Sequence, residues 1–364
     1  MAQTGTRLRV VGIDGELDFD PERLAGFLSH WLGEAGEMHV ARVGGGQSNP
    51  TYFVTTASHE MVLRKRPNGA ILASAHAIDR EFRVLQALAE TPVPTPRPLV
   101  FQTESDILGT PFYLMERLQG RVFHDSKLPG VSAADRRQMY LSMADALAAL
   151  HAIDPKSVGL ADFGRSGSYF ARQLARWGRQ WRESSTKGIP ELDAVIDWLQ
   201  SQLPEEEGPI SIAHGDFRIG NLIFHPTEPR VVGILDWELA TLGTPLADLG
   251  FCCMTWFIGP DEYSGIGGLD LDMLGIPSII DFIARYEGRE RPSGSLTRFH
   301  VVFALFRYAV IFVGIADRAR AGTAADANAR VTGGLARNFA KRALEMATSD
   351  DVHSKYSVLP QSNR

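Results

Sequence analysis

One short stretch of the chain combines acidic, amide and basic residues at spacings that suit phosphoryl transfer. It reads His-Gly-Asp-Phe-Arg-Ile-Gly-Asn (214–221), and another carboxylate, Asp236, follows fifteen residues after Asn221. Phosphoryl transfer needs one carboxylate that orients and deprotonates the attacking hydroxyl, and oxygen ligands that hold Mg²⁺ beside the phosphates of ATP. We therefore predict Asp216 as the catalytic base, and Asn221 and Asp236 as ligands of Mg²⁺.

Two further residues of this stretch, His214 and Arg218, flank Asp216 and are predicted to belong to the catalytic group. The spacing from the Asp to the Asn equals that of the protein-kinase catalytic loop, H-R-D-L-x-x-x-N. Any single carboxylate here could instead be a helix cap or half of a surface ion pair. The combination of residues, each following an apolar strand-like run, favours catalysis.

A glycine-rich segment, residues 43–49, precedes a strand-like run and suits a phosphate-binding loop. Glycines let the backbone approach a phosphate closely, and the backbone N–H groups can donate to its oxygens. We predict nucleotide contacts from Gly45, Gly46, Ser48 and Asn49. A plain turn is the alternative explanation. The segment is not the G-x-G-x-x-G that opens a helix in dinucleotide-binding folds.

A basic residue is expected on the next strand, and the run 61–65 ends in Arg64-Lys65. Side chains alternate along a strand, so these two point to opposite faces. Comparison with the V-A-I-K strand of kinases favours Arg64 as the phosphate-facing residue, with Glu81 on the following helix as its partner. Lys65 stays an alternative, and both charges could be ordinary surface residues.

The run Phe112–Leu118 is predicted to connect two lobes and to hold the adenine ring. The backbone of Glu116 and Leu118 would face the edge of the base, with Met115 behind it. A plain buried strand would use the same residues.

The elements that must position these residues differ between two parts of the chain. Strand-like runs at 51–55, 61–65 and 111–117 and helical patterns at 20–35 and 74–90 predict a small antiparallel-sheet lobe over residues 1–118. Residues 119–350 are predicted to form a larger, mostly helical lobe, with a tail at 351–364. Its strands are expected at 210–213 and 231–235, and its helices at 132–151, 168–182, 190–202, 272–288, 297–320 and 326–347. The fold class is thus α+β and bilobal, with a nucleotide-binding first lobe and a catalytic, substrate-binding second lobe.

The bulk composition narrows the class of protein. The chain has 364 residues and a net charge of −6, which argues against a general binder of nucleic acid. Cys252 and Cys253 are adjacent and offer no disulfide framework, so we expect a reducing cytoplasm. No signal peptide is expected at the start. The apolar run Val301–Ala316 is interrupted by Arg307 and too short for a membrane span. Neither the oligomeric state nor ATP over GTP follows from the sequence.

These motifs together resemble the aminoglycoside phosphotransferase-like kinases, a superfamily with a protein-kinase-like fold. The nearest resemblance is to the kinase-like domains fused to certain acyl-CoA dehydrogenases. The matching segments are Gly-Gly-Gly-Gln-Ser-Asn-Pro-Thr-Tyr (44–52), Val-Leu-Arg-Lys-Arg-Pro (62–67), Arg-Glu-Phe-Arg-Val-Leu (80–85), Val-Pro-Thr-Pro (93–96), Tyr-Leu-Met-Glu-Arg (113–117), His-Gly-Asp-Phe-Arg-Ile-Gly-Asn-Leu-Ile-Phe (214–224) and Leu-Asp-Trp-Glu-Leu-Ala (235–240).

The resemblance implies the roles already given to Asp216, Asn221 and Asp236. It further implies that Asp248 braces the catalytic loop and that His214 organises the loop without acting as the base. The superfamily often has Lys where this chain has Arg64. Arginine can still pair with phosphate oxygens, although its guanidinium is larger.

The acceptor is less well defined by the sequence. The apolar runs after Asp248 and at Val301–Ala316 suit an acyl chain better than a polycation, although they could simply form a helical core. Arg172, Arg176 and Arg179 share one helix face and could meet the phosphates of CoA, or form a solvated basic face. The resemblance favours a hydroxyacyl compound or hydroxyacyl-CoA as the small-molecule alcohol. The alternatives are a kinase of a polar alcohol, such as an aminoglycoside or a choline-like amine, and a nucleotide-binding regulatory module without transfer activity.

Overall fold

The chain folds into two compact units. The structure, a computed structural model, describes residues 7–44, 49–68, 78–165, 167–205, 207–288, 294–322, 329–349 and 359. Unit 1 comprises Met1–Gln119 together with Gly233–Glu238, and unit 2 comprises Gly120–Val232 and Leu239–Arg364. The sequence predicted two contiguous lobes, with residues 233–238 in the second. In the structure the segment Gly233–Glu238 packs with unit 1 instead.

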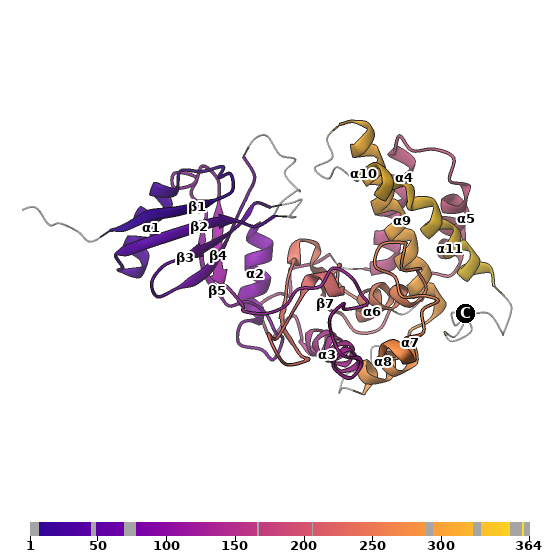
Figure 1. Ribbon diagram of the computed structural model, residues 1–364. Helices are drawn as coiled ribbons and strands as arrows, with labels where there is room; N and C mark the ends of the chain where they lie inside the picture. The colour runs from indigo at the N-terminus through magenta and orange to yellow at the C-terminus, as the bar shows by residue number, and fades with distance from the viewer. Residues whose placement is uncertain are drawn as a thin grey trace, which may run out of the picture. The chain divides into compact units, whose positions relative to one another are not determined.

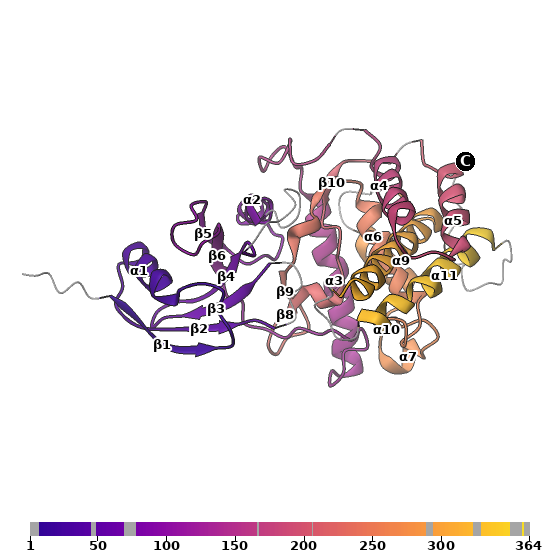
Figure 2. The same cartoon turned by 90° about the horizontal axis from the view of Figure 1, so that it is seen from above.

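Unit 1 is built on a six-stranded sheet with the order β1-β2-β3-β4-β6-β5 (Figures 1 and 2). The strands are β1 (Leu8–Asp14), β2 (Gly36–Arg42), β3 (Thr51–Thr55), β4 (Glu60–Lys65), β5 (Pro98–Gln102) and β6 (Phe112–Glu116). Neighbours pair antiparallel except β1 and β2, which are parallel. The expected sheet is therefore extended by a parallel edge strand, because α1 (Pro21–Leu32) makes the long crossover that parallel strands require.

Local signals set the helices of unit 1. The side chain of Asp20 accepts a hydrogen bond from the Glu22 N–H and caps α1, and Pro21 occupies its first turn. Leu24 and Leu28 of α1 are buried in the core of the sheet. The second helix, α2 (Ile78–Leu88), buries its predicted apolar stripe and also Glu81. A buried charged residue such as Glu81 needs a partner of opposite charge, and Glu81 has one in Arg64.

Unit 2 is mostly helical. Its helices are α3 (Ala133–Ala152), α4 (Tyr169–Glu183), α5 (Pro190–Ser201), α6 (Pro245–Cys253), α7 (Leu271–Leu274), α8 (Ile279–Glu287), α9 (Arg298–Arg320), α10 (Ala329–Gly334) and α11 (Ala336–Thr348). Two short strand pairs also occur: β7 (Ser211–Ala213) with β10 (Thr241–Gly243), and β8 (Leu222–Phe224) with β9 (Val231–Ile234), whose last two residues belong to unit 1. Short 3-10 turns lie at Ile219–Asn221 and Met254–Trp256, and a third, Trp237–Leu239, begins in the unit 1 segment Gly233–Glu238.

Two predicted helices are each split in the structure. The stretch 272–288 is broken between α7 and α8, because Gly275 ends α7 in a left-handed conformation and Pro277 cannot continue a helix. The stretch 326–347 divides into α10 and α11. Helix α6, which the sequence interpretation did not include, starts at a Thr244 cap followed by Pro245. Its nine residues are all buried, so it has no polar face to reveal a helical period.

The core of unit 2 centres on α9. Among the described residues it is the helix whose length and composition would allow a membrane span, yet 78% of its apolar window is buried inside the protein. It packs against α11, α10 and α6. We interpret α9 as a core helix on the basis of this burial. At 23 residues it is longer than the apolar run Val301–Ala316, so the expectation that the run is too short for a membrane span is not what supports this interpretation.

Candidate active site

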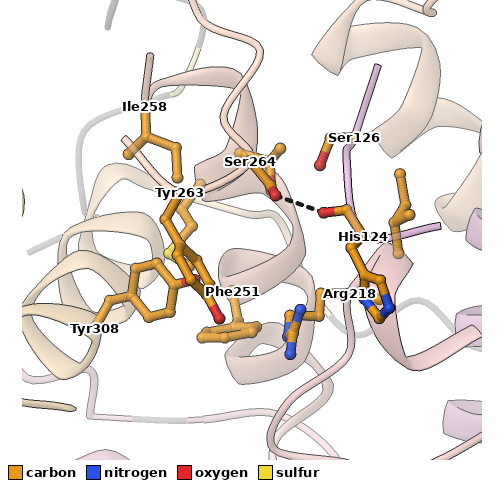
Figure 3. A pocket seen from close by; sticks show the side chains of 12 residues that line it. His124, Ser126, Arg218, Phe251, Ile258, Tyr263, Ser264 and Tyr308 are labelled. Atoms are coloured by element: carbon orange, nitrogen blue, oxygen red, sulfur yellow. Dashed lines mark hydrogen bonds between the residues drawn. The ribbon is translucent and has the colours of Figure 1, made fainter. Parts of the chain in front are cut away.

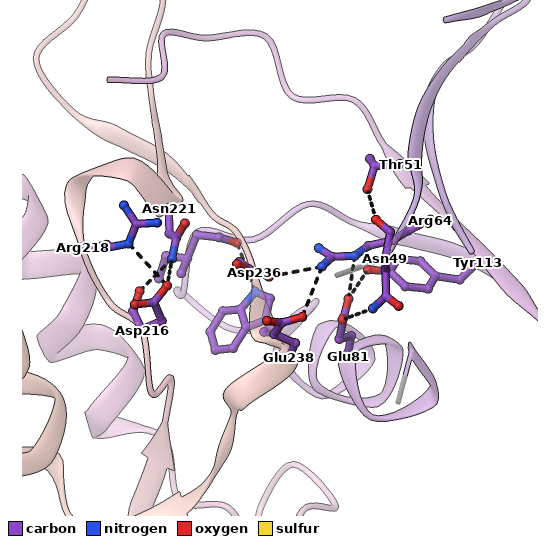
Figure 4. A network of polar contacts seen from close by, with 12 residues as sticks. Asn49, Thr51, Arg64, Glu81, Tyr113, Asp216, Arg218, Asn221, Asp236 and Glu238 are labelled. Atoms are coloured by element: carbon purple, nitrogen blue, oxygen red, sulfur yellow. Dashed lines mark hydrogen bonds and ion pairs between the residues drawn. The ribbon is translucent and has the colours of Figure 1, made fainter. Parts of the chain in front are cut away.

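In unit 1 the predicted pair of Arg64 and Glu81 is present (Figure 4). Arg64 Nε lies 3.2 Å from Glu81 Oε2, and Arg64 Nη2 donates to Asp236 Oδ1 at 3.1 Å. Glu238 Oε2 lies 4.0 Å from the same Nη2. Three carboxylates therefore surround one guanidinium. Burial favours its neutral form, but the interactions with Glu81, Tyr113 and Asp236 outweigh that effect and raise the pKa of Arg64, which stays charged.

Two more side chains fix Glu81 (Figure 4). Asn49 Nδ2 donates to Oε1 at 2.9 Å, and the Tyr113 hydroxyl donates to Oε2 at 2.9 Å. Burial raises the pKa of Glu81 to about 7, in spite of the opposing charge of Arg64. Tyr113 was not among the predicted site residues. It lies directly opposite Arg64 in the β4–β6 register, which only strand pairing reveals.

Lys65 lies in a different network. Its side chain is fully buried, and Nζ donates to Asp18 Oδ2 at 2.9 Å and to Asn68 Oδ1 at 3.1 Å. The Tyr52 hydroxyl donates to the other oxygen of Asp18. These enclosed contacts favour Arg64, which contacts Asp236, as the residue that meets phosphate.

The other predicted nucleotide contacts lie around β6 or outside the described residues. The Glu116 N–H donates to the Arg97 carbonyl, and the Arg117 N–H donates to the Glu60 carbonyl. Neither bond uses the Glu116 carbonyl or the Leu118 N–H, the groups expected to face adenine. Met115 is buried. The predicted contacts Gly45, Gly46 and Ser48 lie outside the described residues.

In unit 2 the catalytic loop closes on itself as its spacing predicted (Figure 4). Asn221 Nδ2 donates to the Asp216 carbonyl at 2.8 Å and to Asp216 Oδ2 at 2.7 Å. Because Nδ2 is the amide donor, these bonds leave Asn221 Oδ1 as the atom that can ligate a cation. Arg218 Nε contacts the same Asp216 Oδ2 at 3.4 Å.

The backbone of this loop is held by Asp248 at the start of α6. Asp248 Oδ1 accepts from the Gly215 N–H at 2.8 Å, and Oδ2 accepts from the His214 N–H at 2.5 Å. Burial favours the neutral carboxyl, but hydrogen bonding to His151 and the charges nearby outweigh it and lower the pKa of Asp248. His214 Nδ1 accepts from the Asp216 N–H at 3.1 Å. Both residues thus make the bracing contacts that the resemblance implied.

Arg307 is a site residue that sequence reasoning missed. It lies in α9, is 7% exposed, and donates from Nη2 to the Gly215 carbonyl. Its guanidinium carbon is 5.5 Å from the ring centre of Trp177 and 5.1 Å from that of Phe251. Gly215 has a φ of +83°, and a side chain there would meet Leu239. The one signal of it in the sequence was that Arg307 is a charged residue in the middle of the apolar run Val301–Ala316.

A small cavity of about 30 Å³ lies beside the catalytic loop within unit 2 (Figure 3). Arg218 contributes to its wall, and so do apolar side chains of Ile219, Phe251, Met254 and Ile258. Hydroxyl-bearing residues complete it: Ser126, Thr255, Tyr263, Ser264 and Tyr308, with His124 and Gly220 beside them. None of these lining residues, all within the described part of unit 2, is acidic.

The loop that delivers two of these hydroxyls is strained. Tyr263 and Ser264 have φ values of 68° and 63°, in the left-handed region that non-glycine residues seldom occupy. Ser264 Oγ donates to the His124 carbonyl at 2.6 Å (Figure 3). The Tyr263 ring contacts those of Tyr308 and Phe312 in α9. Aromatic packing and the Ser264 bond therefore hold this wall of the cavity, together with backbone bonds from the Ile266 N–H to the Thr255 carbonyl and from the Gly267 N–H to the Ile258 carbonyl.

The predicted metal ligands fit Mg²⁺ by their chemistry. Asp236 has a φ of +68° and a side chain that is 34% exposed, and Arg64 engages its Oδ1 and not its Oδ2. Asn221, in unit 2, offers its Oδ1. Carboxylate and amide oxygens of this kind are ligands that Mg²⁺ accepts, with water and phosphate oxygens in its other positions.

Solved structures define the class of protein. A protein of Ralstonia eutropha, provisionally assigned as an aminoglycoside phosphotransferase, shares 42% identity with this chain at a TM-score of 0.82, covering 90% of this chain and 98% of its own. At 14% identity and a TM-score of 0.61, a thermostable mutant of the aminoglycoside phosphotransferase APH(4)-Ia in complex with AMP-PNP and hygromycin B covers 89% of this chain and 98% of its own. Choline kinase of Cryptosporidium parvum has 11% identity and a TM-score of 0.65, with coverages of 93% and 99%. The last two show the fold alone, which is the protein-kinase-like fold.

The family follows from the sequence comparisons. A model of the phosphotransferase enzyme family matches residues 39–274, and the chain belongs to that family. Among curated relatives, mouse acyl-CoA dehydrogenase family member 10 is 38% identical over 90% of this chain, and the probable acyl-CoA dehydrogenase IBR3 of Arabidopsis thaliana is 39% identical over 93%. The matches span 31% and 43% of these two relatives. The protein is a phosphotransferase with a hydroxyl acceptor, and it corresponds to a part of each of these longer relatives.

Proposed function

We propose that this protein transfers the γ-phosphate of ATP, with Mg²⁺, to the hydroxyl of a hydroxyacyl compound, with hydroxyacyl-CoA as one candidate. The contact of Asn221 with Asp216 carries the proposal, because it holds a base and a potential metal ligand in one turn. Such positioning, with electrostatic stabilisation, is the main requirement of phosphoryl transfer.

The residues of this chain have separable tasks in the step. The acceptor hydroxyl attacks the γ-phosphorus, its proton passes to Asp216, and the bond to the β-phosphate oxygen breaks so that ADP leaves with the electron pair. Bound Mg²⁺ would neutralise phosphate charge, held by Asp236 and Asn221. Arg64, kept charged and oriented by Glu81, would pair with phosphate oxygens.

Two observations support an acyl acceptor. The cavity lined by Arg218 has apolar and hydroxyl-bearing side chains and no acidic lining residue among those described, whereas a polycationic antibiotic calls for carboxylates. The curated relatives carry acyl-CoA dehydrogenase names, and the matching region is only part of each. Arg176 belongs to the predicted basic face on α4. Its guanidinium carbon is 5.2 Å from the ring centre of Trp177, and burial together with the charge of Arg307 lowers the pKa of Arg176.

The test is release of ADP from Mg-ATP with a panel of alcohols. The panel contains hydroxyacyl thioesters, free hydroxy acids, hygromycin B and choline, and ³¹P NMR identifies any phosphate ester. We expect acceptor-dependent turnover with the hydroxyacyl compounds, absent in Asp216→Asn. Turnover confined to hygromycin B or choline would overturn the acyl assignment, and acceptor-independent nucleotide binding alone would favour the regulatory-module alternative.

A further inference from the structure

The cavity beside the catalytic loop contains a single arginine whose bonding is incomplete. Arg218 Nε contacts Asp216 Oδ2 at 3.4 Å, and among the described residues this is its one ion pair. A guanidinium has five N–H donors, so most of those on Arg218 are available to a ligand. The side chain is 35% exposed, which keeps it accessible.

The surroundings keep this guanidinium charged and leave it uncompensated on the cavity side. Burial favours its neutral form, but the nearby Asp216 outweighs that effect and raises the pKa of Arg218. Figure 3 shows Arg218 beside Phe251 and the phenol groups of Tyr263 and Tyr308, at the edge of the cavity. Phenols and serine hydroxyls can both donate and accept hydrogen bonds, so the cavity is rich in donors around one cation.

We propose that Arg218 determines acceptor specificity by donating to a carbonyl or carboxylate oxygen that lies a few bonds from the hydroxyl to be phosphorylated. The inference rests on the proposed function and identifies which feature of the acceptor this chain recognises. The size of the guanidinium limits the number of bonds between hydroxyl and recognised oxygen, because Nε contacts Asp216, the proposed base, and Nη1 and Nη2 of the same group remain for the oxygen. The cavity of about 30 Å³ has room for a group the size of one or two waters, such as the recognised oxygen, and not for a whole acyl chain.

The same geometry selects against cationic acceptors. An ammonium group in this cavity would lie beside Arg218, with no acidic lining residue to offset the repulsion. A neutral alcohol without the carbonyl would leave the Arg218 donors unpaired. The predicted order of binding is therefore hydroxy acid or hydroxyacyl thioester first, diol second and amino alcohol last.

The experiment uses probes of one chain length that differ at one group. They are 3-hydroxydecanoate, its N-acetylcysteamine thioester, 1,3-decanediol and 1-amino-3-decanol, with 10-hydroxydecanoate to move the hydroxyl away from the carboxylate. Calorimetry measures binding to the full chain in the presence of Mg-ADP, so the result does not depend on turnover. We expect the first two probes to bind at least tenfold more tightly than the diol, the amine and the terminal hydroxy acid. The thioester and the free acid separate the two sources of the recognised oxygen.

The variants Arg218→Met and Arg218→Lys identify the residue, with Arg182→Met on the exposed end of α4 as the matched control. Arg218→Met should bind 3-hydroxydecanoate ten- to hundredfold more weakly, as loss of a charge-assisted hydrogen bond implies, and should leave the diol within a few-fold. Arg218→Lys should restore part of the difference. If Arg218 only supported Asp216, turnover would fall equally for every acceptor and the binding order would stay the same, which would overturn the inference.

Failure of the proposed function has a different signature. If no probe were phosphorylated, yet the hydroxy acid bound in the expected order and lost that order in Arg218→Met, the kinase assignment would be wrong and the specificity inference would stand. Equal binding of all probes to the unmodified protein would overturn the inference even with normal turnover.

Discussion

The two units hold their functional arginines in opposite ways. In unit 1, Arg64 has Glu81, Asp236 and Glu238 around it, and Glu81 is itself fixed by Asn49 and Tyr113.

In unit 2, Arg218 has one carboxylate at 3.4 Å, and Arg307 contacts a backbone carbonyl and two aromatic rings. An arginine held in place by several carboxylates suits a ligand that is bound in every cycle, such as a nucleotide. An arginine such as Arg218, whose N–H donors are largely open, suits the acceptor, which is the ligand that the protein must select. The predictions below separate these two roles, starting with the largest expected effect.

Replacing the base should abolish chemistry and leave the nucleotide site of unit 1 intact. Asp216→Asn keeps the side-chain shape, and its amide oxygen can still accept from Asn221, but it cannot take the hydroxyl proton. We expect turnover to fall by roughly 10²–10⁴, or about 3–5.5 kcal/mol in barrier, with little change in ATP affinity. Steady-state kinetics and ATP calorimetry check this. Near-normal turnover in the folded, Mg-ATP-bound variant would remove Asp216 as the base.

Replacing Asp236 should remove the effect of Mg²⁺ on nucleotide binding and leave the binding of the nucleotide itself. Asp236→Ala loses the proposed Mg²⁺ ligand and frees one side of Arg64, so ATP alone should bind at least as well as before. Saturation at about a hundred times Kd stabilises a protein by about 2.7 kcal/mol. We expect the part of this stabilisation that depends on Mg²⁺ to disappear in thermal melts. The control is Glu238→Ala, which should keep it; an unchanged Mg²⁺ effect in Asp236→Ala would contradict the ligand assignment.

Replacing Arg64 should impair ATP binding, whereas replacing its neighbour Lys65 in β4 should impair stability. Arg64→Met should weaken ATP binding roughly ten- to hundredfold, as expected for lost charge-assisted bonds to phosphate. Lys65→Met leaves Asp18 without its buried partner, so it should cost about 2 kcal/mol of folding free energy and change ATP affinity little. Denaturant melts and ATP calorimetry on both variants make the comparison. An exchange of the two phenotypes would assign the phosphate contact to Lys65.

Loss of the brace from α9 should affect turnover moderately. Arg307→Met leaves the buried Gly215 carbonyl without its donor, a cost of about 1–3 kcal/mol, and loosens the loop that carries Asp216. We expect kcat to fall about tenfold with KM for ATP unchanged, because the nucleotide contacts lie in unit 1. Arg307→Lys should recover part of the rate. If kcat and the melting temperature fell equally in Arg307→Met and Arg307→Lys, Arg307 would have a role in folding only.

The smallest expected effect is a pH dependence from Glu81. Its pKa is raised to about 7 in the folded protein, so between about pH 4.5 and 7 the folded state holds a proton that the unfolded state has lost. This contribution to stability is full below pH 4.5 and is lost as the pH rises through 7. Above 7 the ionised carboxylate orients Arg64, so ATP affinity should increase a few-fold across neutral pH. Glu81→Gln should flatten both profiles; an unchanged pH step in that variant would assign it to another group.

Much of the site could be predicted because its parts are local in the sequence. Asp216 and Asn221 meet within one turn. Helices α1 and α3 begin directly after residues 20 and 132, where the predicted helical ranges start, and the side chains of Asp20 and Ser132 cap them. Strand β3 has the predicted bounds Thr51–Thr55. In each case the interacting groups are a few residues apart, so residue type and spacing are sufficient information.

The sequence by itself therefore determined which residues are proposed for the chemistry: a base, two oxygen ligands and a basic residue with its acidic partner, in the order of a kinase. Only the tertiary structure decided which distant side chains support them. Tyr113 reaches Glu81 through strand pairing, Arg307 reaches Gly215 from a helix 92 positions later, and Tyr263 lines the cavity through a strained loop. No periodicity encodes such contacts, because they depend on how whole elements pack and not on the spacing of residues along any one of them.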